Sequence, residues 1–240
     1  MKKGKAVTQG APQEVDETSL KSQKKRSEPN VLSAQDLAGR LREDIVTGRL
    51  VPNQRLVEAD IAEDYGASRG NIRVALSELS VEGLVERVQN RGARVRAVSV
   101  EEAVEITEVR AAVEALCAKK AAERITESQQ VLLQEIGRKM VDAVGRGDRE
   151  LYSMANEQLH REIIEISGQR TAAETIRRLQ GQAVRYQFRL SRQHDRPKQS
   201  LPQHLAIIDA ICARDGSGAA EAMNAHLASV AEAIVVAGAD

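Results

Sequence analysis

Aromatic side chains are scarce in this chain of 240 residues: they make up 2% of the sequence, and tryptophan is absent. The apolar core must therefore be built from Ala, Leu, Ile and Val, a composition that favours helices. Cysteine is also rare. Cys117 and Cys212 stand inside helical patterns without Cys-x-x-Cys spacing, so we expect each to be a small core hydrophobe rather than a metal or redox group.

Long apolar runs are missing as well. Charged residues break them well short of the roughly 18 to 20 residues that a membrane span needs. Residues 1–30 contain lysines but no apolar segment, so they do not form a secretory signal, and we expect a cytoplasmic, nucleoid-associated protein. The same residues are rich in Lys, Glu, Gln, Ser and Thr, a composition typical of a disordered tail.

Net charge is absent overall, because 35 Lys and Arg balance 35 Asp and Glu. The neutral total hides a local excess of positive charge, since residues 67–96 carry six Arg against three Glu. Salt screens charges beyond about 8 to 10 Å, so a local basic surface can bind phosphates on a neutral protein. The neutral total therefore does not exclude nucleic acid.

Three short helices follow the tail. The first begins at an N-cap, Ser33, and its apolar positions recur at helical spacing up to Gly48. The second covers Glu58 to Tyr65 and stops at Gly66, and the third runs from Ser68 to about Glu82.

A hairpin comes next. The segment LVERVQNRGARVRAV predicts two short strands around a turn at Asn90, Arg91 and Gly92. Three helices and a hairpin make a winged helix-turn-helix, which we place at residues 31–98. In that unit the third helix lies in the DNA major groove.

Strand signals vanish after residue 100. Helical periodicity dominates six segments separated by short breaks, namely 101–125, 127–145, 148–167, 170–192, 199–214 and 217–237. The fold class is therefore mainly α, with the winged helix-turn-helix followed by an all-α bundle of six to seven helices over residues 101–238.

The stretch ASRGNIRVALSELSVEGLVERVQNRGARV resembles the helix-turn-helix and wing of the GntR family, and the resemblance spans Leu37 to Val95. The family's recognition helix opens with a Ser-Arg-Thr-Pro-hydrophobic-Arg-Glu-Ala-Leu pattern. The matching residues here are Ser68, Arg69, Ile72, Arg73, Ala75 and Leu76. The departures are Gly70, Asn71 and Val74, which stand where Thr, Pro and Glu are usual.

The chemistry of the third helix fits DNA reading independently of the family. Arg69 and Arg73 are four residues apart near the helix N-terminus, where guanidinium groups can bind guanine or phosphate. Ser68 caps the helix and can reach a phosphate, and Asn71 is a candidate for adenine. The resemblance also implies that Glu58 contacts DNA or orients a contact.

The resemblance assigns the wing a role too. It implies minor-groove or backbone contacts from Arg91 and Gly92.

Three of the four histidines stand on apolar helix faces. His160 shares its face with Ile163, His204 with Ile207 and Ile208, and His226 with Leu227. A buried imidazole without a partner costs about 1 to 3 kcal/mol, and three converging imidazoles find a partner most simply in a divalent metal. A single inward histidine is more often a hydrogen-bonded core residue, so the argument depends on all three.

The bundle resembles the FCD domain, the ligand-binding module of the FadR branch of the GntR family, over roughly Val104 to Val230. The matching motifs are Asn156 and His160 in NEQLH, His204 in QHLAIIDAI, and His226 in AHL. This resemblance implies a transition metal, Zn or Ni, with open positions that a ligand carboxylate can fill. Leu159 and Gln203 replace the usual Phe and Glu, and asparagine supplies only a neutral oxygen, which makes the site more positive.

An anionic effector needs a cation beside the metal. Arg110 matches the arginine that the family places on its first sensing helix, and its neighbours Ile106 and Val113 indicate that it flanks the buried face. We therefore predict that Arg110 binds the effector.

Together these features predict a repressor rather than an enzyme: a homodimer that reads two palindromic half-sites of double-stranded DNA and responds to a small organic acid. Two other hypotheses stay open. The bundle could be a metal-dependent hydrolase with a DNA-binding head, since three His ligands leave a position for water, although no acidic residue is evident as a general base. It could also be a dimerisation module with structural histidines.

Overall fold

The computed structural model describes residues 32–88, 92–191, 193 and 195–238. The predicted disordered tail, the predicted hairpin turn and Arg91 therefore lie outside the described residues. Within the described ranges no helix is both long and apolar enough to cross a membrane.

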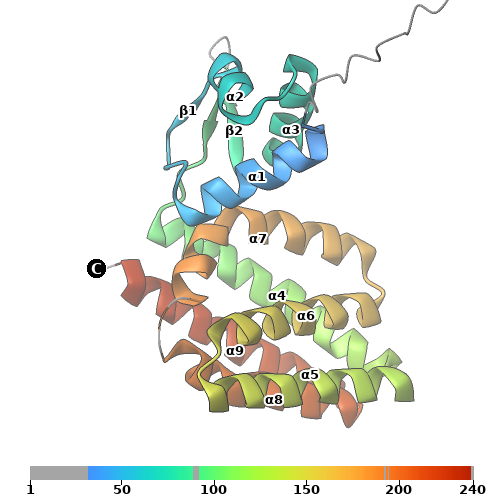
Figure 1. The fold of residues 1–240 in the computed structure, drawn as a ribbon. Helices are drawn as coiled ribbons and strands as arrows, with labels where there is room; N and C mark the ends of the chain where they lie inside the picture. The colour runs from blue at the N-terminus through green and yellow to red at the C-terminus, as the bar shows by residue number, and fades with distance from the viewer. Residues whose placement is uncertain (1–31, 89–91, 192, 194, 239–240) are drawn as a thin grey trace, which may run out of the picture. The chain divides into compact units, whose positions relative to one another are not determined.

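The N-terminal part is a winged helix (Figure 1). Its elements are α1 (Ala34–Thr47), β1 (Arg55–Leu56), α2 (Glu58–Tyr65), α3 (Arg69–Val81), β2 (Val85–Val88) and β3 (Gly92–Val95). The strands pair antiparallel in the order β1-β3-β2, with Glu86 and Arg55 both opposite Arg94. The three helices agree with the sequence prediction, whereas β1 was not predicted.

Local chemistry accounts for the helix boundaries. The Ser33 hydroxyl accepts a hydrogen bond from the Asp36 amide at 3.1 Å, which caps α1. Gly48 and Gly66 end α1 and α2 with φ angles of 87° and 65°, a conformation that glycine adopts without strain. One face of each helix is buried, so the apolar residues of the winged helix form a core of their own.

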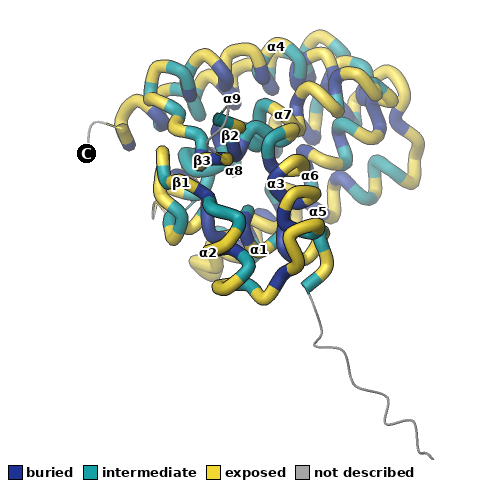
Figure 2. Tube along the Cα trace, turned by 90° about the horizontal axis from the view of Figure 1, so that it is seen from above, coloured by how far each residue is buried: buried dark blue, intermediate teal, exposed yellow. Residues whose placement is uncertain are grey.

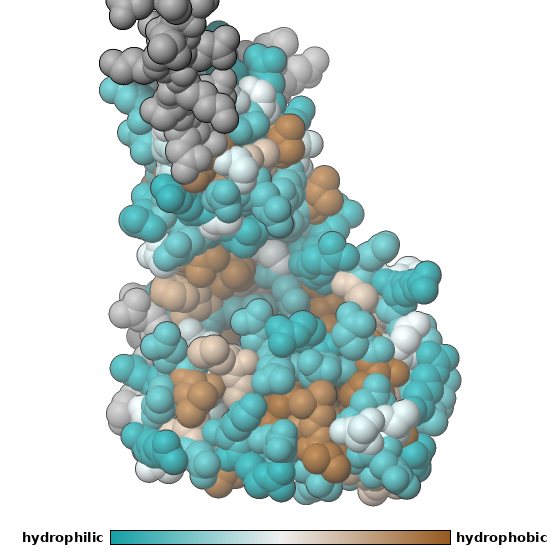
Figure 3. All heavy atoms as spheres, turned by 45° about the vertical axis from the view of Figure 1, so that its right-hand side comes forward, coloured by the Kyte–Doolittle hydropathy of each residue, from teal (hydrophilic) through white to brown (hydrophobic). Residues whose placement is uncertain are grey.

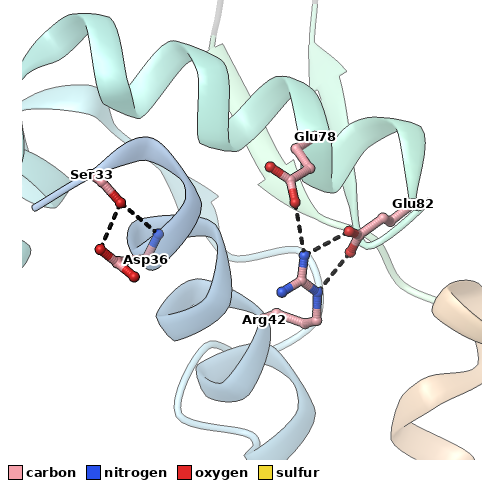
Figure 4. Close-up of polar contacts among 5 residues, drawn as sticks. All are labelled: Ser33, Asp36, Arg42, Glu78 and Glu82. Carbon is pink, nitrogen blue, oxygen red and sulfur yellow. Dashed lines mark hydrogen bonds and ion pairs between the residues drawn. The ribbon is translucent and has the colours of Figure 1, made fainter.

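An ion-pair network ties α1 to the end of α3 (Figure 4). Arg42 donates to both carboxylate oxygens of Glu82, from Nε at 2.8 Å and from Nη2 at 2.6 Å, and to Glu78 at 3.3 Å. Glu78 lies in the last turns of α3 and Glu82 is the C-cap residue that follows it, and the guanidinium is partly exposed. The network therefore connects α1 to the end of α3. Its contribution to the free energy of unfolding is small, because partly exposed ion pairs stabilise a fold only weakly.

The C-terminal part is a helical bundle with a separate apolar core (Figure 1). Its helices are α4 (Val100–Arg124), α5 (Glu127–Arg146), α6 (Arg149–Ser167), α7 (Arg170–Ser191), α8 (Arg196–Cys212) and α9 (Gly216–Gly238). Five of them agree with the predicted segments within two residues. The α8 prediction was wrong at its start, since the helix begins at Arg196 with Pro197 in its first turn.

Helix α4 is central to the bundle and packs against α6, α7, α8 and α9. Half of its buried residues are alanines, and four of these lie in its second half: Ala115, Ala118, Ala121 and Ala122. Small side chains let helix axes approach closely, which is how a chain with few aromatics fills its core. Buried residues line the inward faces of the helices and exposed ones the outward faces (Figure 2). On the face in Figure 3, apolar side chains form separate patches among hydrophilic ones.

Truncating a core side chain of the bundle should be costly. We expect Leu133→Ala, at a fully buried position on α5, to lower the free energy of unfolding by about 2–5 kcal/mol through lost burial and a cavity. The control is Val131→Ala on the same helix, 56% exposed, which should change it by less than about 0.5 kcal/mol. Urea unfolding followed by circular dichroism measures both, and equal effects would contradict the described packing.

Candidate functional site

Helix α3 presents two arginines to solvent. Ser68 accepts a hydrogen bond from the Asn71 amide at 3.2 Å and so caps the helix, as predicted. Ile72 and Leu76 are buried, whereas Arg69 and Arg73 are exposed on the other side. The helix is separate from α2, which ends at Tyr65, so the break that a helix-turn-helix requires is present.

Contacts within the winged helix already engage three of the predicted DNA-binding residues. Arg73 Nε donates to the Glu58 carboxylate at 3.1 and 3.2 Å, which places Glu58 of α2 as an orienting partner. The Asn71 side-chain amide donates to the carbonyl of Leu32 at 2.8 Å, so one of its two N–H groups is already engaged. Gly92 is exposed at the start of β3.

The three predicted histidines come together inside the bundle. His160 on α6, His204 on α8 and His226 on α9 are 9%, 1% and 3% exposed. One potential ligand atom from each lies within 4.8 Å of the others. The ring centroids of His204 and His226 are 4.3 Å apart. The helical spacing of the sequence therefore placed all three side chains correctly.

Each imidazole is held through Nδ1 by a different side chain. His160 Nδ1 lies 2.9 Å from Glu114 Oε2, His226 Nδ1 lies 3.0 Å from Gln203 Oε1, and His204 Nδ1 lies 2.9 Å from the Tyr152 hydroxyl. A carboxylate and an amide oxygen only accept, so His160 and His226 donate from Nδ1. Their Nε2 lone pairs are then free to bind a metal.

Two buried atoms of the predicted ligand residues have no hydrogen-bond partner within the described part of the chain. They are His204 Nε2 and Asn156 Oδ1, both buried. Asn156 lies one turn before His160 on α6, as the sequence predicted. Buried acceptors rarely go unpaired, so the residues present fit a divalent metal bound by three imidazole nitrogens and an amide oxygen.

Electrostatics also favour metal binding. Burial, followed by the neighbouring His160 and Arg196, holds the pKa of His204 well below its usual value. Burial and the other two histidines do the same for the pKa of His226. Both rings are therefore neutral near pH 7, which is the form that binds a metal.

Glu114 of α4 is the main site residue that sequence reasoning missed. It is 1% exposed and accepts from Arg110 Nε at 2.9 Å as well as contacting His160. Burial alone would raise the pKa of this carboxyl, but the charge of Arg110 and the hydrogen bond from His160 outweigh it and lower the pKa to about 2. The expectation that no acidic residue lies beside the histidines was therefore wrong, although Glu114 is already occupied by two partners.

Arg110 lies where the sequence placed it, on the buried face of α4, and is 5% exposed. Its Nη2 also lies 2.8 Å from Glu114 Oε1. Arg110, Glu114 and His160 are therefore connected by buried hydrogen bonds, with Glu114 in the middle.

Comparison with protein-family models identifies both parts of the chain. The model of bacterial regulatory proteins of the gntR family matches residues 33–95, and the FCD domain model matches residues 105–229. Together they cover the winged helix and most of the bundle.

Curated relatives and solved structures agree with these models. The HTH-type transcriptional regulator BphR of Paraburkholderia xenovorans is 30% identical over 199 residues, 79% of this chain and 80% of its own length. The HTH-type transcriptional repressor RspR of Escherichia coli is 28% identical over 194 residues, 81% of this chain and 85% of its own. The structure of McbR/YncC from E. coli, 22% identical, superimposes with a TM-score of 0.68 over 86% of this chain and 96% of its own, which shows the same fold.

Removing the carboxylate of Glu114 should destabilise the bundle strongly. Glu114→Gln leaves the Arg110 guanidinium buried without an anion, so we expect the free energy of unfolding to fall by about 3–5 kcal/mol. Urea unfolding at pH 7 in the presence of a chelator isolates this effect from any metal. The control is Glu108→Gln, an exposed position on the same helix, and a loss no larger than that of the control would refute the buried ion pair.

Proposed function

Because the chain belongs to the GntR family of bacterial regulatory proteins and carries an FCD domain, it is a DNA-binding transcription regulator, and we propose that it is a repressor controlled by a small carboxylate. The observation that carries the control mechanism is the cluster of three buried histidines, together with a buried, unpaired Asn156 oxygen one turn before His160 on α6. The relatives and fold neighbours are transcription regulators rather than enzymes, so the hydrolase hypothesis has no support.

The proposed DNA interface is the exposed side of α3. Arg69 is exposed and can bind a base or a phosphate, and Arg73, whose Nε contacts Glu58, keeps its other guanidinium nitrogens for a guanine or phosphate. Ser68, Asn71 and the wing residues Arg91 and Gly92 complete the proposed surface. We assign it to a DNA-binding domain at residues 31–98, after a tail at 1–30.

The proposed assembly is a homodimer. One winged helix reads too few base pairs for a specific operator, and helix-turn-helix dimers read two half-sites about one helical turn apart. Apolar residues at helical spacing on the exposed side of α4 support this assembly: Val109 and Leu116 are 51% and 44% exposed, with Ala112 between them. We assign effector binding and dimerisation to residues 101–238.

The proposed sensor is a transition-metal centre, Zn or Ni, bound by Asn156, His160, His204 and His226. A bound metal supplies a Lewis acid with open positions for a carboxylate. The residues around it orient the ligands: Glu114 fixes His160, Tyr152 contacts His204, and Gln203 fixes His226. Arg110 is the proposed contact for the effector carboxylate, which would share its guanidinium with Glu114.

Coupling follows from chain connectivity. Only residues 96–99 separate β3 from α4, the helix that carries Arg110 and Glu114. An effector that binds one arrangement of α4 more tightly than another shifts the population of dimers that can bind DNA.

Arginine substitutions on α3 test the DNA interface. A high-affinity duplex is first selected from a random library with the unmodified protein. We expect Arg69→Ala and Arg73→Ala each to weaken binding to it by about 1–3 kcal/mol, or roughly 5- to 150-fold, because each removes a base or phosphate contact. Fluorescence anisotropy measures the affinity. Arg138→Ala, 67% exposed on α5, is the control, and affinities equal to the control in both variants would remove α3 as the reading helix.

Metal analysis tests the sensor. We expect purified protein to carry about one equivalent of transition metal per chain and the His160→Ala/His204→Ala variant to carry almost none, since two of four ligands are gone. Inductively coupled plasma mass spectrometry after dialysis measures both. Glu157→Ala, an exposed neighbour of Asn156, should retain the metal, and an equal content in all three proteins would end the proposal.

A further inference from the structure

A second arginine lies at the same site, and the sequence prediction passed over it. Arg196 opens α8 and is 9% exposed. Its position is fixed by helical spacing, because Arg196, Ser200 and His204 follow at intervals of four on one buried face of α8. Sequence reasoning assigned this segment to a polar break and so did not consider Arg196.

Helical spacing and one hydrogen bond place the Arg196 guanidinium beside the histidine cluster. Arg196 lies two turns before His204 on the same buried face of α8. Its hydrogen-bond partner, Ser229, lies about one turn after His226 on α9. The guanidinium therefore lies between the two helices that carry His204 and His226.

No carboxylate within the described ranges forms an ion pair with Arg196, although the charge of Glu232 on α9 acts on it from a longer distance. Its Nη1 donates to the Ser229 hydroxyl of α9 at 3.1 Å, and its Nη2 is buried with no hydrogen-bond partner. The neighbouring acid, Asp195, instead contacts Lys198 at 3.2 Å. A buried guanidinium normally has an anionic partner, so Arg196 lacks the partner that its surroundings require.

Arg110 provides the contrast. Both arginines are buried beside the histidines, but Arg110 is neutralised by Glu114 at 2.8 Å. Arg196 also stands in the first turn of α8, where the positive end of the helix dipole adds to its charge. The site therefore has a local excess of positive charge at the α8 side, and a ligand anion can balance it.

We propose that Arg196 binds a second carboxylate of the effector, so that the effector is a small aliphatic dicarboxylate with its other carboxylate at the histidine cluster; this inference rests on the effector function proposed above. The planar guanidinium matches a carboxylate in shape and charge. Ser229 holds the guanidinium through Nη1 and leaves Nη2 for the ligand.

Matched acids test this assignment. Malonate, succinate and glutarate are compared by isothermal titration calorimetry with propionate, butyrate and valerate, which have the same chain lengths and one carboxylate fewer. With zinc-loaded protein we expect the best dicarboxylate to bind at least about tenfold more tightly than its matched monocarboxylate, since a buried charge-assisted hydrogen bond is gained. Arg196→Gln should reduce this ratio to below about threefold while zinc content stays unchanged.

Lys198→Gln is the control, because Lys198 lies in the same helical turn but is 62% exposed, and it should keep the full preference. A preference retained in Arg196→Gln, or no preference in zinc-loaded unmodified protein, would overturn the role of Arg196 and leave the metal site standing. Failure of the unmodified protein to hold zinc would instead refute the sensor function itself.

The stability of the unliganded protein provides an independent test of the role of Arg196. If Arg196 is a ligand-binding charge, Arg196→Gln should leave the urea midpoint of the unliganded protein unchanged or raise it, because a desolvated charge is removed. A clear decrease would show that Arg196 serves the fold instead.

Discussion

The buried carboxylate of Glu114 is the interaction on which the interior of the bundle depends. It neutralises Arg110 and orients His160, and both contacts take place at 1% exposure. An isolated charge in such surroundings is strongly unfavourable, so the three groups stabilise one another only as a set. The set also joins α4 to α6, which makes the position of the first bundle helix depend on the geometry of the histidine cluster.

The sequence predicted the fold well where one local rule decides the structure. Ser33 and Ser68 mark helix starts because a hydroxyl caps free amides, and Gly48 and Gly66 mark ends because they adopt positive φ. Strand β1 was missed because two residues carry no periodicity and pair only through β3. The start of α8 was missed because its first residues are polar and include a proline, a composition typical of a break between helices. Proline is nevertheless tolerated in the first turn of a helix.

The histidines could be predicted because each lies on an apolar helix face, and such a face can be recognised from the sequence of one helix without the tertiary structure. Their partners could not. Arg110 and Glu114 are four residues apart, which in isolation describes an ordinary surface pair. Arg196 has no apolar neighbours of the kind that mark a buried face. These residues belong to the site because α4, α6, α8 and α9 pack together. The sequence of a single helix does not show this packing.

The scarcity of aromatic residues has a practical side. With no tryptophan, three tyrosines and one phenylalanine, the ultraviolet emission of this protein comes mainly from the tyrosine phenols. Tyr152 is one of them, and its hydroxyl touches a ring of the histidine cluster. The fluorescence of Tyr152 should therefore respond to a metal or a metabolite bound at the histidine cluster, so that binding can be followed without a dye or label.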